Sequence, residues 1–179
     1  MDIDLLVKIT ARSWALSILA HLHAGVPGRQ APLLSACGAG RTSFGHSLAH
    51  LQTLGLLERN PGYGHPLRPE FRLTAAGVRA AAMADAICTA SASDTAARLI
   101  RRQWTLPVLA VTRTPRRFSQ MKLDLGGGIT DRALSQTLGA LEDQTWLHRE
   151  VDVSDRPLRP YYQAAHTGLL MSEVVHAAI

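Results

Sequence analysis

The side chains best suited to base-specific hydrogen bonds are concentrated in residues 128–141. Arg132 and Gln136 are four positions apart, so they share one face of a helix. Guanidinium and carboxamide groups make bidentate contacts with guanine and adenine in the major groove of DNA. Leucines at i, i+4 and i+7 form an apolar stripe on the opposite face: Leu134, Leu138 and Leu141. A short helix of this kind, entered by a turn at Gly128 and capped by Thr130, is typical of a DNA-reading helix-turn-helix.

A second such helix is predicted over residues 42–54, where an apolar stripe again faces polar side chains. Arg132 could pair with guanine or contact a phosphate, and Gln136 could pair with adenine. Ser43, His46 and Ser135 could serve either role, and each candidate could instead be an ordinary solvent-exposed side chain. The predicted recognition-helix residues are Thr42, Ser43, His46, His50, Thr130, Arg132, Ser135 and Gln136.

Other chemistry finds little support in the sequence. His46 and His50 have a spacing that could bind zinc, but no third ligand accompanies them, so we predict no metal and no cofactor. Cys37 and Cys88 form no C-x-x-C motif, and we expect two buried, reduced thiols. There is no phosphate loop, no G-x-S-x-G and no H-E-x-x-H, so we predict that the protein is not an enzyme.

The elements that would position these residues occur twice, because the sequence aligns with itself at an offset of 90 residues. The aligned pairs include Asp4 with Asp94, Trp14 with Trp104, Leu33 with Leu123, Gly38 with Gly128, Leu48 with Leu138 and Leu51 with Leu141. After one inserted residue, Pro66–Pro69 aligns with Pro157–Pro160 and Gly77 with Gly168. We therefore predict two tandem domains, at residues 1–92 and 93–179.

Each predicted domain has the same order of elements. Each domain begins with four helices, and Asp4 and Asp94 are the expected N-caps of the two first helices. Pro107 falls in the second helix of the second domain, where a proline is tolerated only in the first turn. A hairpin follows, and a helix closes each domain: a long one at residues 75–90, capped by Thr74, and a shorter one after Gly168. The expected fold is mainly α with small β-hairpin wings: two winged helix-turn-helix domains in a pseudo-twofold arrangement.

The wings and the tryptophans add further candidates. The wing arginines are expected to face phosphates or the minor groove, or else solvent: Arg59, Arg68, Arg149, Arg156 and Arg159. Trp14 and Trp104 begin the second helices, where we expect core packing. The functional alternative for these two residues is a pocket between the domains that binds a small-molecule effector.

Four stretches carry a resemblance to a known family: residues 66–77 (PLRPEFRLTAAG), 97–106 (ARLIRRQWTL), 117–121 (RFSQM) and 128–142 (GITDRALSQTLGALE). They closely resemble the HxlR family of bacterial winged-helix transcription regulators, which is related in architecture to MarR-type regulators. The resemblance implies a DNA-binding domain that normally acts as a homodimer. This chain resembles such a dimer joined covalently, so we expect a monomer that binds two unlike half-sites about one helical turn apart.

Composition narrows the functional classes only mildly. The formal net charge is +5, from 19 basic and 14 acidic residues, which favours double-stranded DNA as a partner. No apolar run approaches the length of a membrane span, and the start of the sequence is acidic where a signal peptide would be basic. We therefore expect a cytoplasmic regulator without membrane contact. The alternatives are a tandem winged-helix scaffold for protein partners and a DNA binder without a regulatory role.

Overall fold

The computed structural model describes residues 2–60, 69–91, 93–152 and 159–178, without the side chains of Asp152 and Arg159. We call the described residues up to 91 the N-terminal half and those from 93 onward the C-terminal half. The N-terminal half contains α1 (Ile3–Thr10), α2 (Ala15–His23), α3 (Gln30–Cys37), α4 (Arg41–Thr53), β1 (Leu57–Asn60), β2 (Glu70–Leu73) and α5 (Ala75–Ala90).

The C-terminal half contains α6 (Asp94–Ile100), α7 (Thr105–Val111), β3 (Arg116–Arg117), α8 (Phe118–Asp124), α9 (Asp131–Asp143), β4 (Leu147–Asp152), β5 (Arg159–Ala164) and α10 (His166–Ala178). The prediction of a mainly helical chain with small antiparallel hairpins is therefore confirmed. No helix in the described ranges is both long and apolar enough to cross a membrane.

The helix ends follow local capping rules, with two corrections to the predicted caps. Thr74 caps α5 as expected, since its hydroxyl accepts a hydrogen bond from the Gly77 amide at 3.0 Å. Asp4 and Asp94 are not caps: Asp2 and Ser93 hold those positions. Asp4 and Asp94 lie instead in the first turns, where a negative charge still favours the helix dipole. Pro107 lies in the first turn of α7, as predicted.

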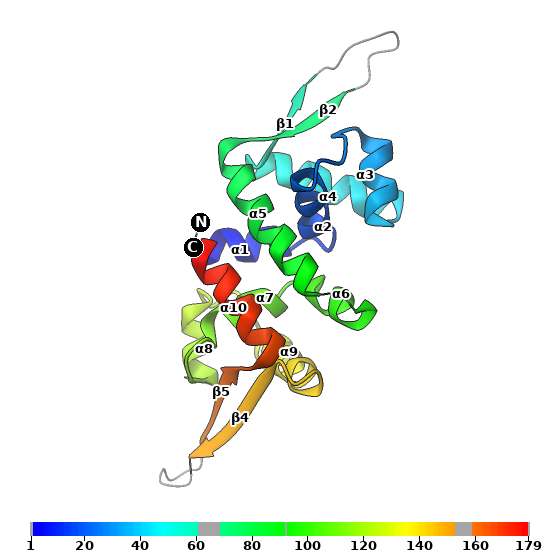
Figure 1. The fold of residues 1–179 in the computed structure, drawn as a ribbon. Helices are drawn as coiled ribbons and strands as arrows, with labels where there is room; N and C mark the ends of the chain where they lie inside the picture. Colours follow the sequence, from blue (N-terminus) through cyan, green and yellow to red (C-terminus); the bar gives the residue numbers. More distant parts are fainter. Residues whose placement is uncertain (1, 61–68, 92, 153–158, 179) are drawn as a thin grey trace.

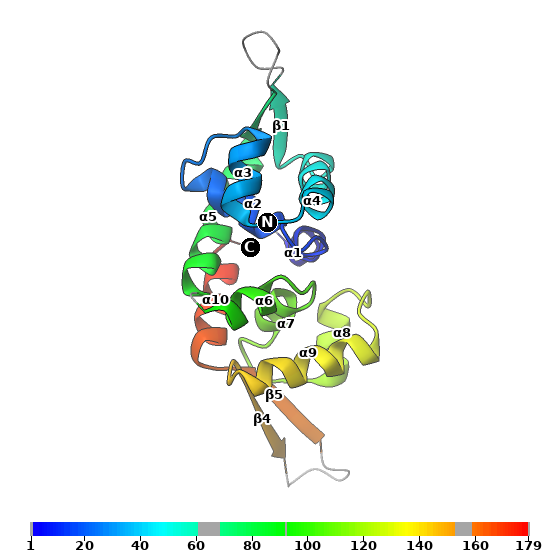
Figure 2. The same cartoon turned by 90° about the vertical axis from the view of Figure 1, so that its right-hand side faces the viewer.

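Two antiparallel sheets form the wings. In the N-terminal half β1 pairs with β2, with Leu57 opposite Leu73. In the C-terminal half the strand order is β3-β5-β4, and the short β3 was not predicted. Two residues are too few to show the alternating pattern by which a strand is predicted. Figures 1 and 2 show the two hairpins at opposite ends of the molecule.

One part of the predicted internal alignment is wrong in register. Leu33 was matched with Leu123, but Leu33 is fully buried whereas Leu123 is 78% exposed. The buried counterpart of Leu33 is Met121, so the offset is 88 residues in this segment. The left-handed glycine that ends α3 is Gly38, and the corresponding glycine after α8 is Gly126 rather than Gly128. The turn before α9 is longer than the turn before α4, and this restores the offset of 90.

In both halves the closing helix packs closely against the residue that precedes the first strand of the hairpin. A Cβ atom at Gly77, in the first turn of α5, would overlap the carbonyl oxygen of Leu56. A Cβ atom at Gly168, near the start of α10, would overlap the carbonyl oxygen of Trp146. Glycine at these positions lets each closing helix pack directly on the chain that enters its hairpin.

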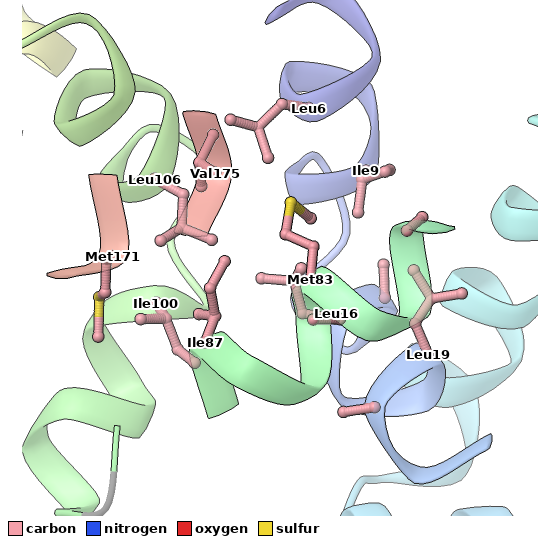
Figure 3. Packing of buried hydrophobic residues seen from close by; sticks show 14 of the residues in the cluster. Leu6, Ile9, Leu16, Leu19, Met83, Ile87, Ile100, Leu106, Met171 and Val175 are labelled. Atoms are coloured by element: carbon pink, nitrogen blue, oxygen red, sulfur yellow. The ribbon is translucent and has the colours of Figure 1, made fainter. Parts of the chain in front are cut away.

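The hydrophobic core is continuous across the two halves. Helix α5 packs on α2 and on α10, α10 packs on α7, and α1 packs on α7. Figure 3 shows side chains from α1, α2 and α5 next to side chains from α6, α7 and α10. Leu6 from α1 and Leu106 from α7 are fully buried. Burial of such a leucine is worth about 1.5–3 kcal/mol, so the packing between the halves contributes to the stability of both.

Candidate nucleic-acid interface

Helix α9 separates an apolar face from a polar one as the sequence predicted. Thr130 caps the helix, because its hydroxyl accepts a hydrogen bond from the Ala133 amide at 3.2 Å. The leucine stripe is buried: Leu134, Leu138 and Leu141. Arg132, Ser135 and Gln136 are exposed on the other side. We call these exposed polar side chains the α9 face.

Helix α4 has the same burial pattern but different chemistry. Phe44, Leu48 and Leu51 are buried together with Ser47, whose hydroxyl donates to the Ser43 carbonyl. Three of the predicted recognition residues are exposed, namely Thr42, Ser43 and His46, and we call them the α4 face. The helix begins at Arg41, one residue before the predicted start, after Gly40. The hydroxyl of Ser43 donates to the Gly40 carbonyl at 3.0 Å.

His50 does not belong to the α4 face. Its Nε2 atom lies 2.7 Å from the carbonyl oxygen of Lys8, near the end of α1. A carbonyl oxygen can only accept, so Nε2 donates the hydrogen bond and the imidazole is held against α1. His50 is therefore a contact between helices, which the spacing along α4 alone did not reveal. Because its Nε2 atom is engaged in this contact, His50 is not positioned to bind one metal ion together with His46.

Two of the predicted wing arginines can be placed in full. Arg59 in β1 and Arg149 in β4 are both exposed, and they lie opposite Phe71 and Tyr162 in their sheets. Arg159 lies in β5, but its side chain is outside the described part of the chain. Arg68 and Arg156 fall outside the described residues.

Further cations near these helices were missed in the sequence. Arg41 is exposed in the first turn of α4. Arg117 precedes α8, donates to the Tyr161 hydroxyl, and stacks over the Tyr161 ring with its guanidinium carbon 4.8 Å from the centroid. Arg116 pairs with Asp124 at 3.0 Å. The adjacent arginines before a predicted helix were the available signal, but only the pairing of β3 with β5 brings them to the wing.

The two helix pairs differ in charge. Helices α3 and α4 contain no acidic residue, whereas α8 and α9 contain Asp124, Asp131, Glu142 and Asp143. Asp131, in the first turn of α9, forms an ion pair with Lys122 of α8. Acidic groups oppose phosphate contacts, so α3 and α4 provide the more favourable field for DNA.

Comparison with known protein families gives a match in the C-terminal half. Residues 99–178 match the family model described as HxlR-like helix-turn-helix. The match covers somewhat less than half of the chain and runs from the end of α6 to the end of α10. It suggests a DNA-binding transcription regulator. Neither curated proteins nor solved structures gave a match.

The tryptophans line different cavities, so a single pocket with both in its wall is not formed by the described residues. Trp14 lines a cavity between the halves, together with Cys37 and Cys88. Trp104, in the HxlR-like segment, lines an open groove beside α9 that also includes Gln136. Both side chains pack partly against the core, as we expected from the sequence.

The two cysteines are free thiols at the Trp14 cavity; Cys37 is buried as predicted, whereas Cys88 is only half-buried. Burial raises the pKa of Cys37, although a hydrogen bond with Ser17 works in the opposite direction. Burial, together with the nearby Asp85 and Cys37, raises the pKa of Cys88 to about 11. Both thiols are therefore neutral near pH 7, which disfavours thiolate chemistry. Among the described residues, no group of three or more His, Cys, Asp or Glu side chains is arranged to hold a metal ion.

Proposed function

We propose that this protein is a sequence-specific transcription regulator that binds double-stranded DNA through two winged helix-turn-helix modules. The observation that carries the proposal is the exposed α9 face within a segment that matches the HxlR-like model. The α4 face extends it to the N-terminal half, because α4 has the same buried stripe and the same exposed opposite side. In this proposal the side chains on both faces read bases, and the wing arginines contact phosphates.

A duplication of one module is supported by contacts that recur at the aligned positions. The amide of Leu56 donates to the Leu51 carbonyl at 3.0 Å, and the amide of Trp146 donates to the Leu141 carbonyl at 2.9 Å. The carbonyls of Leu56 and Trp146 each accept from the residue before the closing helix, and each lies against a glycine of that helix. We infer that the chain is a pseudo-dimer that acts as a monomer in the cytoplasm, without catalytic activity.

The unlike faces imply an asymmetric DNA site. Thr42 and His46 occupy the positions that Arg132 and Gln136 occupy in α9. A threonine and a histidine offer different hydrogen-bonding groups from an arginine and a glutamine, so the two helices would prefer different bases. We therefore propose two unlike half-sites about one helical turn apart.

Selection of binding sequences from random duplex DNA, with the purified protein, tests this function. Enrichment of a bipartite, asymmetric site is the expected result. Affinity for that site should fall with rising salt, with a logarithmic slope of about −0.9 per phosphate contact. Absence of any DNA binding at low salt would contradict the proposed function. A single symmetric site would contradict the proposal of two unlike half-sites.

A variant of Arg132 sharpens the same assay. Arg132→Ala should weaken binding by about 1–3 kcal/mol and relax the preference at one base position if the guanidinium reads guanine. A uniform loss over all sequences would make Arg132 a phosphate contact instead. Arg98→Ala is the matched control, because Arg98 is exposed on α6 and lies outside both faces.

A scaffold for protein partners is the second candidate, and the acidic residues of α8 and α9 favour it. Four carboxylates on these two helices would weaken a DNA contact, but they suit a basic protein surface. This candidate predicts that the isolated protein fails to bind duplex DNA even at low salt. A DNA binder without a regulatory role would instead bind with no preference among duplex sequences.

A further inference from the structure

A cavity of about 210 Å³ lies where the two halves meet. The N-terminal half contributes Leu16 from α2, and the C-terminal half contributes Ala97 and Ile100 from α6. In the view of Figure 3, Leu16 and Ile100 lie on either side of Ile87 from α5. The space therefore depends on how α2, α5 and α6 pack together, and an occupant would contact both halves at once.

One wall of the cavity is an indole ring held by a cation. The guanidinium carbon of Arg101 lies 4.6 Å from the centroid of the Trp14 ring. Trp14 is the N-cap residue of α2 and Arg101 is the C-cap residue of α6, so this cation–π contact joins the halves. Arg101 is the only charged residue among the described residues that line the cavity, and its positive charge disfavours a cationic occupant.

Two neutral, polarizable thiols also line the cavity. Cys37 comes from the end of α3 and Cys88 from α5, and burial raises the pKa of both. Neutral sulfur atoms make favourable contacts with aromatic rings. Three serines also line the cavity, and two of them already have partners: the buried Ser91 donates to the Ile87 carbonyl at 2.7 Å, and Ser17 is hydrogen-bonded with Cys37. The exposed Ser13 can bond with one polar group on an otherwise apolar occupant.

We propose that this cavity is an effector site for an uncharged planar aromatic molecule of one or two fused rings. The size supports this class, because an engineered apolar cavity of about 150 Å³ binds benzene and this cavity is larger. An occupant that touches both halves stabilises the arrangement in which they pack. Its effect on DNA affinity rests on the proposed function, whereas its binding to the protein does not.

Calorimetric titration of the full chain with indole, in the absence of DNA, tests the site. We expect saturable binding of one indole per chain and a rise in the unfolding temperature. Ala97→Leu should remove binding, because the larger side chain fills the cavity from α6. Ala110→Leu is the control, since Ala110 is also half-buried but lies outside the lining. Absence of saturable binding, or unchanged binding in Ala97→Leu, would overturn the proposal.

A second pair of variants separates this cavity from the groove beside α9. Trp14→Ala should weaken indole binding at least tenfold, while Trp104→Ala, at the aligned position, should leave it within twofold. The opposite ranking would place the site in the Trp104 groove and overturn the assignment. Tryptamine, which carries an ammonium group, should bind at least tenfold more weakly than indole, and equal binding would contradict the role of Arg101.

The regulatory part is tested separately on the DNA site obtained by selection. Saturating indole should change the affinity of the wild-type chain for that site by at least fivefold, and should have no effect on Ala97→Leu. An unchanged affinity in a chain that binds indole would remove the effector role. Failure to obtain any DNA site would remove the proposed function, while the calorimetric result would still decide the cavity.

Discussion

The α3–α4 and α8–α9 helix pairs have the same backbone plan but opposite charge character. In both regions the second helix buries an apolar stripe and exposes the opposite side. Helices α3 and α4 carry Arg41 and no acid, whereas α8 and α9 carry Lys122 and Arg132 against four acids. The family match falls on the acidic region and not on the acid-free one. The two helix pairs therefore share a buried pattern without being equally suited to bind a polyanion such as DNA.

The difference suggests that the two helix pairs make different kinds of contact in the proposed bipartite interface. Contacts to phosphate supply affinity, and contacts to base edges supply specificity. The region without acids is suited to the first task. The α9 face has Arg132 and Gln136, which are better suited to the second. Paired variants in the two halves can test whether they share a structure and differ in chemistry.

The largest expected effect concerns the shared structure. Gly77→Ala and Gly168→Ala should each lower the free energy of unfolding by about 2–4 kcal/mol, because the new Cβ would overlap a backbone carbonyl. Denaturant unfolding with circular dichroism measures the change. The controls are Gly45→Ala in α4 and Gly139→Ala in α9, where a Cβ meets open space. These should be neutral or stabilising by up to about 1 kcal/mol. A large effect in one half alone would show that the contact is not equivalent.

The next effect concerns the charge of α4. Arg41→Asp places the acid of α9 at the corresponding position of α4, and it should weaken binding to the selected DNA at least tenfold. If Arg41 contacts a phosphate, the logarithmic salt slope should also become shallower by about 0.9. Fluorescence anisotropy over a salt series measures both quantities. An unchanged slope would mean that Arg41 does not contact phosphate.

A smaller effect concerns the contact that only the N-terminal half makes. His50→Ala should lower the free energy of unfolding by about 0.5–1.5 kcal/mol through loss of the hydrogen bond to the Lys8 carbonyl. DNA affinity should stay within twofold of wild type. His46→Ala should behave in the opposite way, with stability unchanged and DNA affinity reduced. If His50→Ala instead affected mainly DNA affinity, His50 would return to the predicted α4 face.

The smallest effect is a gain. Asp131→Asn removes a negative charge beside the α9 face and should strengthen DNA binding about two- to threefold. It should also cost about 0.3–1 kcal/mol of stability, because an acid in the first turn favours the helix dipole and because the ion pair with Lys122 is lost. Asp94→Asn is the matched control, since Asp94 holds the same position in α6, away from both faces. Weaker DNA binding in Asp131→Asn would mean that the carboxylate accepts a hydrogen bond from a base.

Much of the local structure could be predicted from the sequence. The leucine stripe of α9, the Thr130 and Thr74 caps and the hairpins followed from periodicity and side-chain chemistry. The correspondence of Leu33 with Met121 was missed, because helices of only 8 and 7 residues give a weak periodic signal. The position of His50 on α4 suggested a DNA contact, but its imidazole is hydrogen-bonded to the Lys8 carbonyl of α1.

The sequence by itself determined the helices, their buried stripes, their caps and the chemistry of the exposed faces. These properties depend on neighbours three or four residues apart, and such spacings are visible along the chain. Tertiary structure alone decided that Trp14, Cys37, Cys88 and Arg101 surround one cavity, and that Arg117 stacks on Tyr161. Those contacts join residues far apart in sequence, and they arise from how whole helices and strands pack.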